Sequence, residues 1–489
     1  MLVLAVVLFA ALASNASAAS TPFIAIDLGT LGGPNSAALA VNAGGQVVGY
    51  SRTTSSGVET HAFSWTPAGG MVDLGTLGGS SSTALAVNAS GQVVGYSDVA
   101  GNAASHAFSW TPANGITDLG TLSGSSSTAL AVNASGQVVG YGDTTGNAAS
   151  HAFSWTPADG MSDLSRNLSD GRFSQALAVN ADGQAVGYSY AAGDGAQYAF
   201  SWTPASGTID LTLGTTFSLA NAVNASGQVV GWIEPVVAEY HAFSWTQAGG
   251  MIDLGTLGGS ASTALAVNAS GQVVGSSYTA GDTLTHAFSW TQASGMTDLG
   301  TLGGSSSTAV AVNASGQTVG SGDTAGDAAT HAFSWTRAGG MIDLGTPGGT
   351  DSVALAVNDR GQVVGYSDLP ISHPLAPPEY HAVLWQPISN LGCHATLAGC
   401  DLSGLNLAGA YLPRANLSGA KLKGANLARA NLHGANLSDA NLKDANLASA
   451  NLTRASLDGA HVTGVAWSHT LCPDGTNSDA NGGTCVGHL

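Results

Sequence analysis

The sequence predicts an all-β protein built from two repeat regions of different period. The motif V-N-x-x-G-Q occurs eight times at a spacing of 44 to 47 residues, and a later segment places Leu at every fifth position. Charged residues make up only 8% of the chain, whereas Gly, Ser, Thr and Val are abundant. This composition disfavours long helices and favours short strands joined by turns.

The N-terminus resembles an export signal. Within residues 1–18, the apolar run from Leu2 to Ala13 is shorter than the roughly 20 residues that a membrane span needs, and the small residues at its end fit cleavage after Ala18. No Lys or Arg precedes the run, which departs from the usual pattern. We expect a secreted, extracellular or periplasmic protein with no membrane span.

Each long repeat carries four predicted strands. In the repeat that spans residues 83–120, the candidate strands are 84–88, 92–97, 106–111 and 116–119. Short runs rich in Val, Tyr, Phe and Trp and bounded by Gly, Pro, Asn and Ser indicate strands. Four strands in a period of 40–50 residues are typical of a propeller blade. The sequence therefore predicts an eight-bladed β-propeller over residues 19–390, with seven blades as the alternative.

Alternation along the third strand predicts how the blades stack. His106, Phe108 and Trp110 fall on one face of that strand, and Ala107 and Ser109 fall on the other. The bulky face of one blade would then pack against the small face of its neighbour.

Closure of the ring needs a fourth strand for the last blade. The lone segment 23–28 precedes the first full repeat and is the favoured candidate, and 388–391 is its rival.

The long repeats resemble a known family. The phrases D-L-G-T-L-G-G, V-N-x-x-G-Q-V-V-G and H-A-F-S-W, in fixed order over residues 23–386, are similar to the HAF-type extracellular repeat of microbial proteins. The fourth repeat departs from the pattern, since Tyr198 replaces its His. The resemblance implies an exported repeat protein and no settled activity.

The short repeats resemble a second family. Leu recurs every five residues from Leu402 to Leu457, usually with Ala two positions before it and often with Asn directly before it. This pattern is similar to the pentapeptide-repeat family, which implies a short right-handed, four-sided β-helix with Leu and Ala inside. We assign residues 391–465 to it and 466–489 to a cap. Residues 391–489 carry six basic and six acidic side chains, and this balance argues against mimicry of DNA.

Four cysteines in an exported chain predict two disulfides. Three pairings are possible, and we favour the one local in sequence, Cys393–Cys400 with Cys472–Cys485. The second of these would close the cap, with Trp467 over the last coil of the helix.

The net charge of −19 argues against nucleic-acid binding, which needs a basic surface. All of the excess negative charge lies before residue 391, where the chain has five basic and 24 acidic residues. Each blade repeats one Asp on its fourth strand, and seven blades repeat one His on the third. These Asp and His side chains lie far from the ring axis, so those of different blades cannot come together. We therefore expect them to form hydrogen bonds within or between blades, and we expect neither a metal site nor a cofactor. Calcium at isolated turns stays open.

The repeat pattern breaks in the fourth and fifth units, and there we place the candidate site. Loops after the second and fourth strands of a blade share one face, so aromatic, basic and acidic side chains would gather on one sector. Flat rings with polar neighbours are typical of a sugar site. The candidate ligand-binding residues are Arg172, Phe173, Tyr190, Phe217, Trp232, Glu234 and Glu239.

Three functions remain open at this stage. We favour a non-catalytic binding or structural protein whose partner is a carbohydrate, a cell-surface polymer or an extracellular protein. The alternative is a propeller-type glycoside hydrolase or lyase, which needs paired carboxyl groups. Only Asp170, Glu234, Glu239 and Asp351 lie outside the repeat pattern. The third is an interaction scaffold. Nothing in the sequence indicates the oligomeric state.

Overall fold

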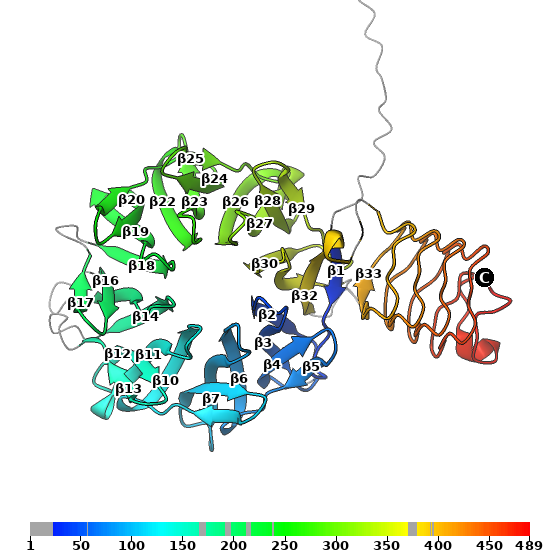
Figure 1. Ribbon diagram of the computed structural model, residues 1–489, viewed down its shortest axis with the longest axis horizontal. Helices are drawn as coiled ribbons and strands as arrows, with labels where there is room; N and C mark the ends of the chain where they lie inside the picture. The colour runs from blue at the N-terminus through cyan, green and yellow to red at the C-terminus, as the bar shows by residue number, and fades with distance from the viewer. Residues whose placement is uncertain are drawn as a thin grey trace, which may run out of the picture.

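The computed structural model describes residues 23–55, 57–165, 173–190, 197–211, 217–236, 239–369, 379–391, 393 and 396–489. Small antiparallel sheets form a ring, and a coil of short repeats is attached at one side of that ring (Figure 1). The prediction of an all-β fold is confirmed. The predicted signal peptide, residues 1–18, lies outside the described residues.

In the described part of the chain the ring consists of eight units of four antiparallel strands, consecutive in sequence in units 1 to 7. The first strands of units 1 to 8 are β2 (Ser36–Val41), β6 (Gly78–Val87), β10 (Ser123–Val132), β14 (Ser174–Val179), β18 (Ser218–Val223), β22 (Gly258–Val267), β26 (Gly303–Val312) and β30 (Ser352–Val357). The second strands are β3 (Val47–Arg52), β7 (Val93–Val99), β11 (Val138–Thr144), β15 (Ala185–Tyr190), β19 (Val229–Val236), β23 (Val273–Thr279), β27 (Thr318–Thr324) and β31 (Val363–Asp368).

The outer half of each unit follows the same order. The third strands are β4 (Thr60–Thr66), β8 (Ser105–Thr111), β12 (Ser150–Thr156), β16 (Gln197–Thr203), β20 (Glu239–Thr246), β24 (Thr285–Thr291), β28 (Thr330–Thr336) and β32 (Tyr380–Pro387). The fourth strands are β5 (Gly70–Asp73), β9 (Gly115–Asp118), β13 (Gly160–Asp163), β17 (Gly207–Asp210), β21 (Gly250–Asp253), β25 (Gly295–Asp298) and β29 (Gly340–Asp343), with β1 (Phe23–Asp27) in unit 8. Short 3₁₀ turns occur at η1 (Thr145–Asn147), η3 (Ala325–Asp327), η4 (Ile388–Leu391) and η5 (Ser478–Asn481).

The N-terminal strand closes the ring. β1 pairs antiparallel with β32, with Ala25 opposite Trp385 and Asp27 opposite Val383. The rival segment forms η4 instead. The first and last strands of the ring thus share one sheet, which resists opening of the ring.

Neighbouring units stack as the alternation along the third strand predicts. Phe108 of unit 2 shares a buried cluster with Val48 and Ala62 of unit 1, whereas Ala107 shares one with Phe153 of unit 3. Each bulky face therefore meets a small one, and close packing of this kind is what stabilises a protein core.

A glycine on the second strand makes the sheet geometry possible. The first two strands of each unit shift register by one residue, as between Ala38 and Ala40. Because of this bulge, a Cβ atom on Gly49 would lie 1.9 Å from the carbonyl oxygen of Ala37, and the equivalent glycines are equally close to theirs. Any side chain here would push the strands apart.

A closed set of hydrogen bonds joins the eight units around the ring. In each V-N-x-x-G-Q turn the Asn Nδ2 donates to the backbone oxygen of the corresponding Asn in the next unit, and Asn358 returns to Asn42. The eight donors, at 2.9 to 3.1 Å, are Asn42, Asn88, Asn133, Asn180, Asn224, Asn268, Asn313 and Asn358.

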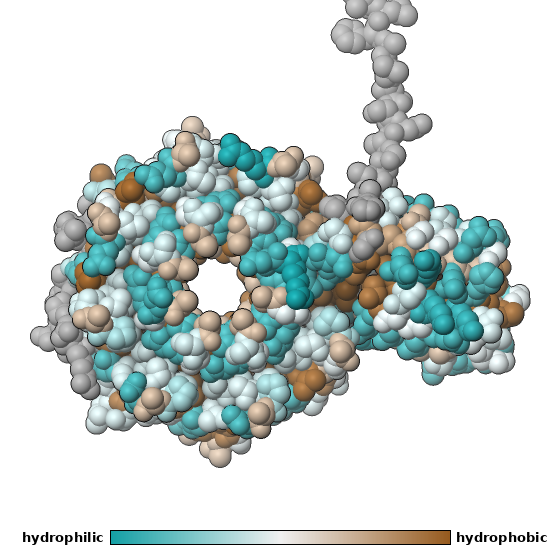
Figure 2. All heavy atoms as spheres, viewed as in Figure 1, coloured by the Kyte–Doolittle hydropathy of each residue, from teal (hydrophilic) through white to brown (hydrophobic). Residues whose placement is uncertain are grey.

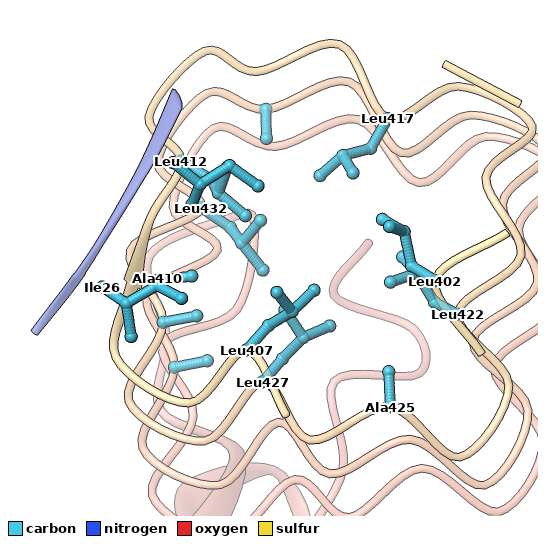
Figure 3. Packing of buried hydrophobic residues seen from close by; sticks show 14 of the residues in the cluster. Ile26, Leu402, Leu407, Ala410, Leu412, Leu417, Leu422, Ala425, Leu427 and Leu432 are labelled. Carbon is cyan, nitrogen blue, oxygen red and sulfur yellow. The ribbon is translucent and has the colours of Figure 1, made fainter. Parts of the chain in front are cut away.

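The C-terminal coil has one turn every 20 residues. Parallel bridges join positions 20 apart, such as Asn406, Asn426 and Asn446, whose side chains also form a ladder at 3.0 and 3.1 Å. Leucines of successive turns stack inside, as Leu407 and Leu427 do in Figure 3. This arrangement agrees with the β-helix that the short repeats imply.

The ring and the coil share a hydrophobic core. β1 also pairs with β33 (Ala410–Tyr411), the short strand in the coil, so it lies between ring and coil. Ile26 from β1 lies beside the coil leucines (Figure 3), and it is 4% exposed within their cluster. Hydrophobic residues lie where ring and coil meet, and the ring is open at its centre (Figure 2). The junction is therefore a packed interface.

Candidate ligand-binding site

The candidate residues lie on one face of the ring. Because the strands of a unit alternate in direction, connections between second and third strands share a face with connections between units. We call this the loop face. The V-N-x-x-G-Q turns and the turns between third and fourth strands lie on the opposite side, which we call the turn face.

Unit 4 presents a cluster of three aromatic rings on the loop face. The ring of Phe173 lies 6.1 Å from that of Tyr188 and 5.8 Å from that of Tyr190, and the two tyrosine rings are 5.8 Å apart. The amide of Tyr190 donates to the carbonyl oxygen of Phe173 at 2.9 Å, which fixes the start of β14 against the end of β15. The structure therefore brings the predicted Phe173 and Tyr190 together.

Unit 5 presents an aromatic pair at the corresponding place. The rings of Trp232 and Tyr240 are 5.1 Å apart and nearly perpendicular, at 89°. Tyr240 is 40% exposed. Such an edge-to-face pair holds the indole in one orientation and leaves aromatic surface open to a ligand.

The acidic candidates in unit 5 differ in exposure. The Glu234 amide donates to the carbonyl oxygen of Phe217 at 2.9 Å, and Glu234 is only 8% exposed. Glu239 is partly exposed and lies opposite Val236 near the end of the hairpin. Of the two, Glu239 is better placed to meet a ligand. Arg172 and Asp170 lie outside the described residues.

A second aromatic cluster, where units 8 and 1 meet, escaped the sequence analysis. The rings of Tyr366 and Tyr380 are 5.6 Å apart, and the hydroxyl of Tyr380 lies 3.4 Å from that of Tyr50. One sequence position could have indicated this cluster, namely the residue that follows the glycine of the second strand. This residue lies opposite the Ala of the H-A-F segment, as Tyr50 does to Ala62 and Tyr366 to Ala382. It is aromatic in units 8 and 1 to 5, at Tyr366, Tyr50, Tyr96, Tyr141, Tyr188 and Trp232, and it is serine in units 6 and 7.

Three tyrosines of these clusters, Tyr50, Tyr188 and Tyr366, have raised pKa values. Burial raises the pKa of Tyr50, and the neighbouring Tyr380 hydroxyl adds to this effect. Burial and the nearby Tyr190 raise the pKa of Tyr188, and burial with Tyr380 raises that of Tyr366. Their hydroxyl groups therefore remain hydrogen-bond donors at neutral pH.

The repeated His and Asp residues pair within the sheets. His Nδ1 lies 2.8 to 2.9 Å from an Asp oxygen in seven units, and in unit 8 the partner of His381 is Asp27 of β1. The predicted hydrogen bonds from these side chains are confirmed. In the described residues, no group of three His, Cys, Asp or Glu side chains could hold a metal ion.

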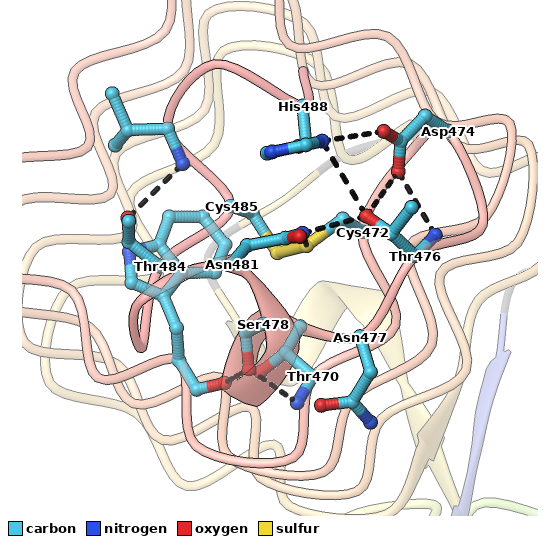
Figure 4. The surroundings of a disulfide bond; sticks show 12 residues. Thr470, Cys472, Asp474, Thr476, Asn477, Ser478, Asn481, Thr484, Cys485 and His488 are labelled. Carbon is cyan, nitrogen blue, oxygen red and sulfur yellow. Dashed lines mark hydrogen bonds and ion pairs between the residues drawn. A yellow bond between two sulfur atoms is a disulfide. The ribbon is translucent and has the colours of Figure 1, made fainter.

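Both disulfides have the pairing local in sequence, Cys393–Cys400 and Cys472–Cys485. The second lies within the terminal cap, together with an ion pair between His488 and Asp474 (Figure 4). Hydrogen bonds from Thr476 and His488 lower the pKa of Asp474 to about 2. Trp467, 5% exposed, occupies the inward position five residues after Val462, so it lies inside the coil. No helix in the described parts of the chain is long and apolar enough to cross a membrane.

The coil is similar to pentapeptide repeat proteins. Residues 394–428 and 425–464 match the family model for pentapeptide repeats. A pentapeptide repeat protein from the cyanobacterium Cyanothece is 44% identical over 14% of this chain and 49% of its own, with a TM-score of 0.12. Another, from Nostoc, is 39% identical over 15% of this chain and 61% of its own, with a TM-score of 0.15. The chain thus spans about half the length of these proteins.

The ring is similar to propeller structures at low identity. The β-propeller domain of the Trilobed protease from Pyrococcus furiosus is 9% identical over 72% of this chain and 96% of its own, with a TM-score of 0.40. No curated protein matches this chain significantly.

Proposed function

We propose that this chain is an exported, non-catalytic binding protein whose loop face recognises a carbohydrate or a surface polymer. In this proposal residues 1–18 are the export signal, and the ring is an eight-bladed propeller of HAF-type repeats. Two disulfides are consistent with export. The closed set of eight Asn hydrogen bonds supports the blade number.

The observation that carries the proposal is the pair of aromatic clusters on adjacent units. The Phe173, Tyr188 and Tyr190 rings of unit 4 and the Trp232 and Tyr240 rings of unit 5 belong to the same sector of the loop face. Most other connections between units consist of Gly, Ser and Thr. Where partly exposed aromatic side chains gather beside connections that depart from this composition, they mark an interaction site.

The chemistry of the sector favours a sugar. The C–H face of a pyranose ring packs on an aromatic ring, and its hydroxyl groups need nearby donors and acceptors. The protonated Tyr188 hydroxyl supplies a donor, and the partly exposed Glu239 supplies an acceptor. A site of this composition orients a neutral ligand without needing a metal ion.

The test is binding of residues 19–489 to an array of glycans and polysaccharides, with calcium and with EDTA. We expect a calcium-independent signal that falls about tenfold, or ~1.4 kcal/mol, in Trp232→Ala and in Tyr190→Ala. Tyr278→Ala is the matched control, since Tyr278 is 40% exposed on β23 of unit 6, outside the sector. Loss of binding in EDTA would point to metal sites instead. No binding to any glycan, or an equal loss in the control, would refute the proposed site.

A further inference from the structure

The turn face carries grooves between neighbouring units that the loop-face site does not use. A cavity of about 420 Å³ lies between units 3 and 4, and one of about 320 Å³ lies between units 4 and 5. A third, of about 330 Å³, lies between units 7 and 8. These grooves recur at equivalent places, so they result from the repeat itself.

Equivalent residues line the first two grooves. Between units 3 and 4, Gln137 and Ser154 come from unit 3, and Gly183 and Trp202 come from unit 4. Between units 4 and 5 the same positions are Gln184, Ser201, Gly227 and Trp245. Each groove therefore has an amide and a hydroxyl on one wall and an indole on the other.

Hydrogen bonds fix the polar wall before any ligand arrives. Gln137 Nε2 donates to Ser154 Oγ at 2.8 Å, and Asn133 Nδ2 donates to Gln137 Oε1 at 3.1 Å. Gly183, at φ +85°, lies so close that a Cβ atom there would be 2.9 Å from Gln137 Oε1. Because these side chains are already ordered, little conformational entropy is lost when a ligand binds to them.

The two grooves next to unit 4 carry no positive charge. The grooves next to unit 4 contain no Lys or Arg among their lining residues, and their acidic residues, Asp159 and Asp182, come from turns. Without a basic side chain, phosphorylated or acidic ligands are disfavoured. An indole opposite neutral amide and hydroxyl groups fits the apolar face and the hydroxyl groups of an uncharged sugar ring.

We propose that these turn-face grooves are a second set of binding sites, each for one uncharged sugar unit. The proposal concerns residues other than the loop-face sector and stands independently of it. The same Gln, Ser, Gly and Trp positions recur at the other junctions among units 1 to 7. Several weak sites on one face of a ring would bind a glycan-coated surface with a strength that no single site has.

The junctions of unit 8 depart from this pattern. Trp385 is fully buried, and Pro387 and Ile388 line the groove between units 7 and 8. Between units 8 and 1, Leu384 and Gln386 replace the Ser and Thr of the other third strands. The indole of Trp385 is therefore an internal negative control.

The experiment uses fluorine NMR of the chain from residue 19, with its ten tryptophans labelled as 5-fluorotryptophan. Single Trp→Phe variants assign the signals of Trp202, Trp232, Trp245 and Trp385. The probes are the methyl glycosides of glucose, galactose, mannose and N-acetylglucosamine, titrated to about 50 mM, where weak single-sugar sites fill.

We expect at least one sugar to shift the Trp202 and Trp245 signals in a saturable way and to leave the Trp385 signal unchanged. Trp202→Phe, which removes the Trp202 signal, should leave the saturation of the Trp245 signal unchanged, because the two grooves have separate indoles. A shift confined to Trp232 would overturn the groove proposal and support the loop-face site. Equal drift of all signals, or no shift of the Trp202 signal with any probe, would also overturn the groove proposal. Binding to the polysaccharide array would still test the loop-face site separately.

Discussion

At the scale of single residues, the Asn of each V-N-x-x-G-Q turn has two separate tasks. Asn224 Oδ1 accepts from the amides of Ser226 and Gln228, which caps its own turn. Its Nδ2 group donates to the backbone oxygen of Asn268 in the next unit. The sequence predicts the first task, because Asn favours turns for this reason. It does not reveal the second, because the acceptor belongs to another sheet.

Asn224→Ala is expected to lower the free energy of unfolding by about 1–3 kcal/mol, since it removes the bond to Asn268 and leaves the amide of the buried Gln228 without its acceptor. Urea unfolding measures this change. Asn114→Ala is the control, because Asn114 is exposed in a turn between outer strands, and it should cost under about 0.5 kcal/mol. Equal effects of the two substitutions would show that the bond between units contributes nothing.

The pair of His331 and Asp343 predicts a dependence of stability on pH. The hydrogen bond that His331 Nδ1 donates to the Asp343 carboxylate is the largest cause that raises the pKa of His331 above 6.5. Because the pKa of His331 is higher in the folded state than in the unfolded chain, protonated His331 stabilises the folded state. This contribution is complete below pH 6.5 and disappears as the pH rises through the raised pKa. The stability advantage of the native chain over His331→Gln should therefore be greatest at pH 5.5 and smallest at pH 8.5, by thermal unfolding.

The control for this prediction is His469→Gln. His469 pairs with Asp479 in the terminal cap, and its side chain is 74% exposed. Solvent screens such a pair, so its loss should change stability little at any pH. A constant difference between the native chain and His331→Gln from pH 5.5 to 8.5 would contradict the expected linkage.

At the scale of elements, regular repeats made most of the strands predictable. Period-two alternation around Phe108 and the Asn turns located the strands of each unit, and Leu at every fifth position indicated the coil. The aromatic contacts were only partly predictable. Tyr190 and Trp232 depart from the repeat and were found, whereas Tyr50 belongs to it and was missed. Its contact with Tyr380 depends on closure of the ring, which joins residues 330 positions apart.

The terminal cap should stabilise the coil through its disulfide. Cys472 and Cys485 are 13 residues apart, and both are fully buried. Because the crosslink restricts the unfolded chain, the double substitution to Ser should cost about 2–4 kcal/mol. Urea unfolding under non-reducing conditions measures it, with Val486→Ala, at a residue 55% exposed, as the control. A loss no greater than that of the control would mean that the cap holds without the disulfide.

At the scale of the whole molecule, the ring and the coil behave as one packed body. The fourth strand of unit 8 is β1, and its other edge pairs with β33 of the coil. One hydrophobic cluster contains Phe63 and Leu384 of the ring together with Leu402 of the coil. When β1 closes the ring, it also provides the strand against which the coil begins. The coil in turn covers the outer edge of β1, which would otherwise be unpaired.

Ile26→Ala tests this coupling, because Ile26 is 4% exposed between the ring and the coil leucines. Removing its buried methyl and methylene groups should cost about 2–5 kcal/mol. Since both parts share that core, calorimetry should show one transition that moves to lower temperature, and fluorine signals from Trp467 in the coil and Trp385 in the ring should melt together. Ile209→Ala, at a residue 36% exposed on β17, is the control and should shift the transition far less. Two transitions, with only one of them moved by Ile26→Ala, would instead mean that the coil folds on a ring that is already complete without it.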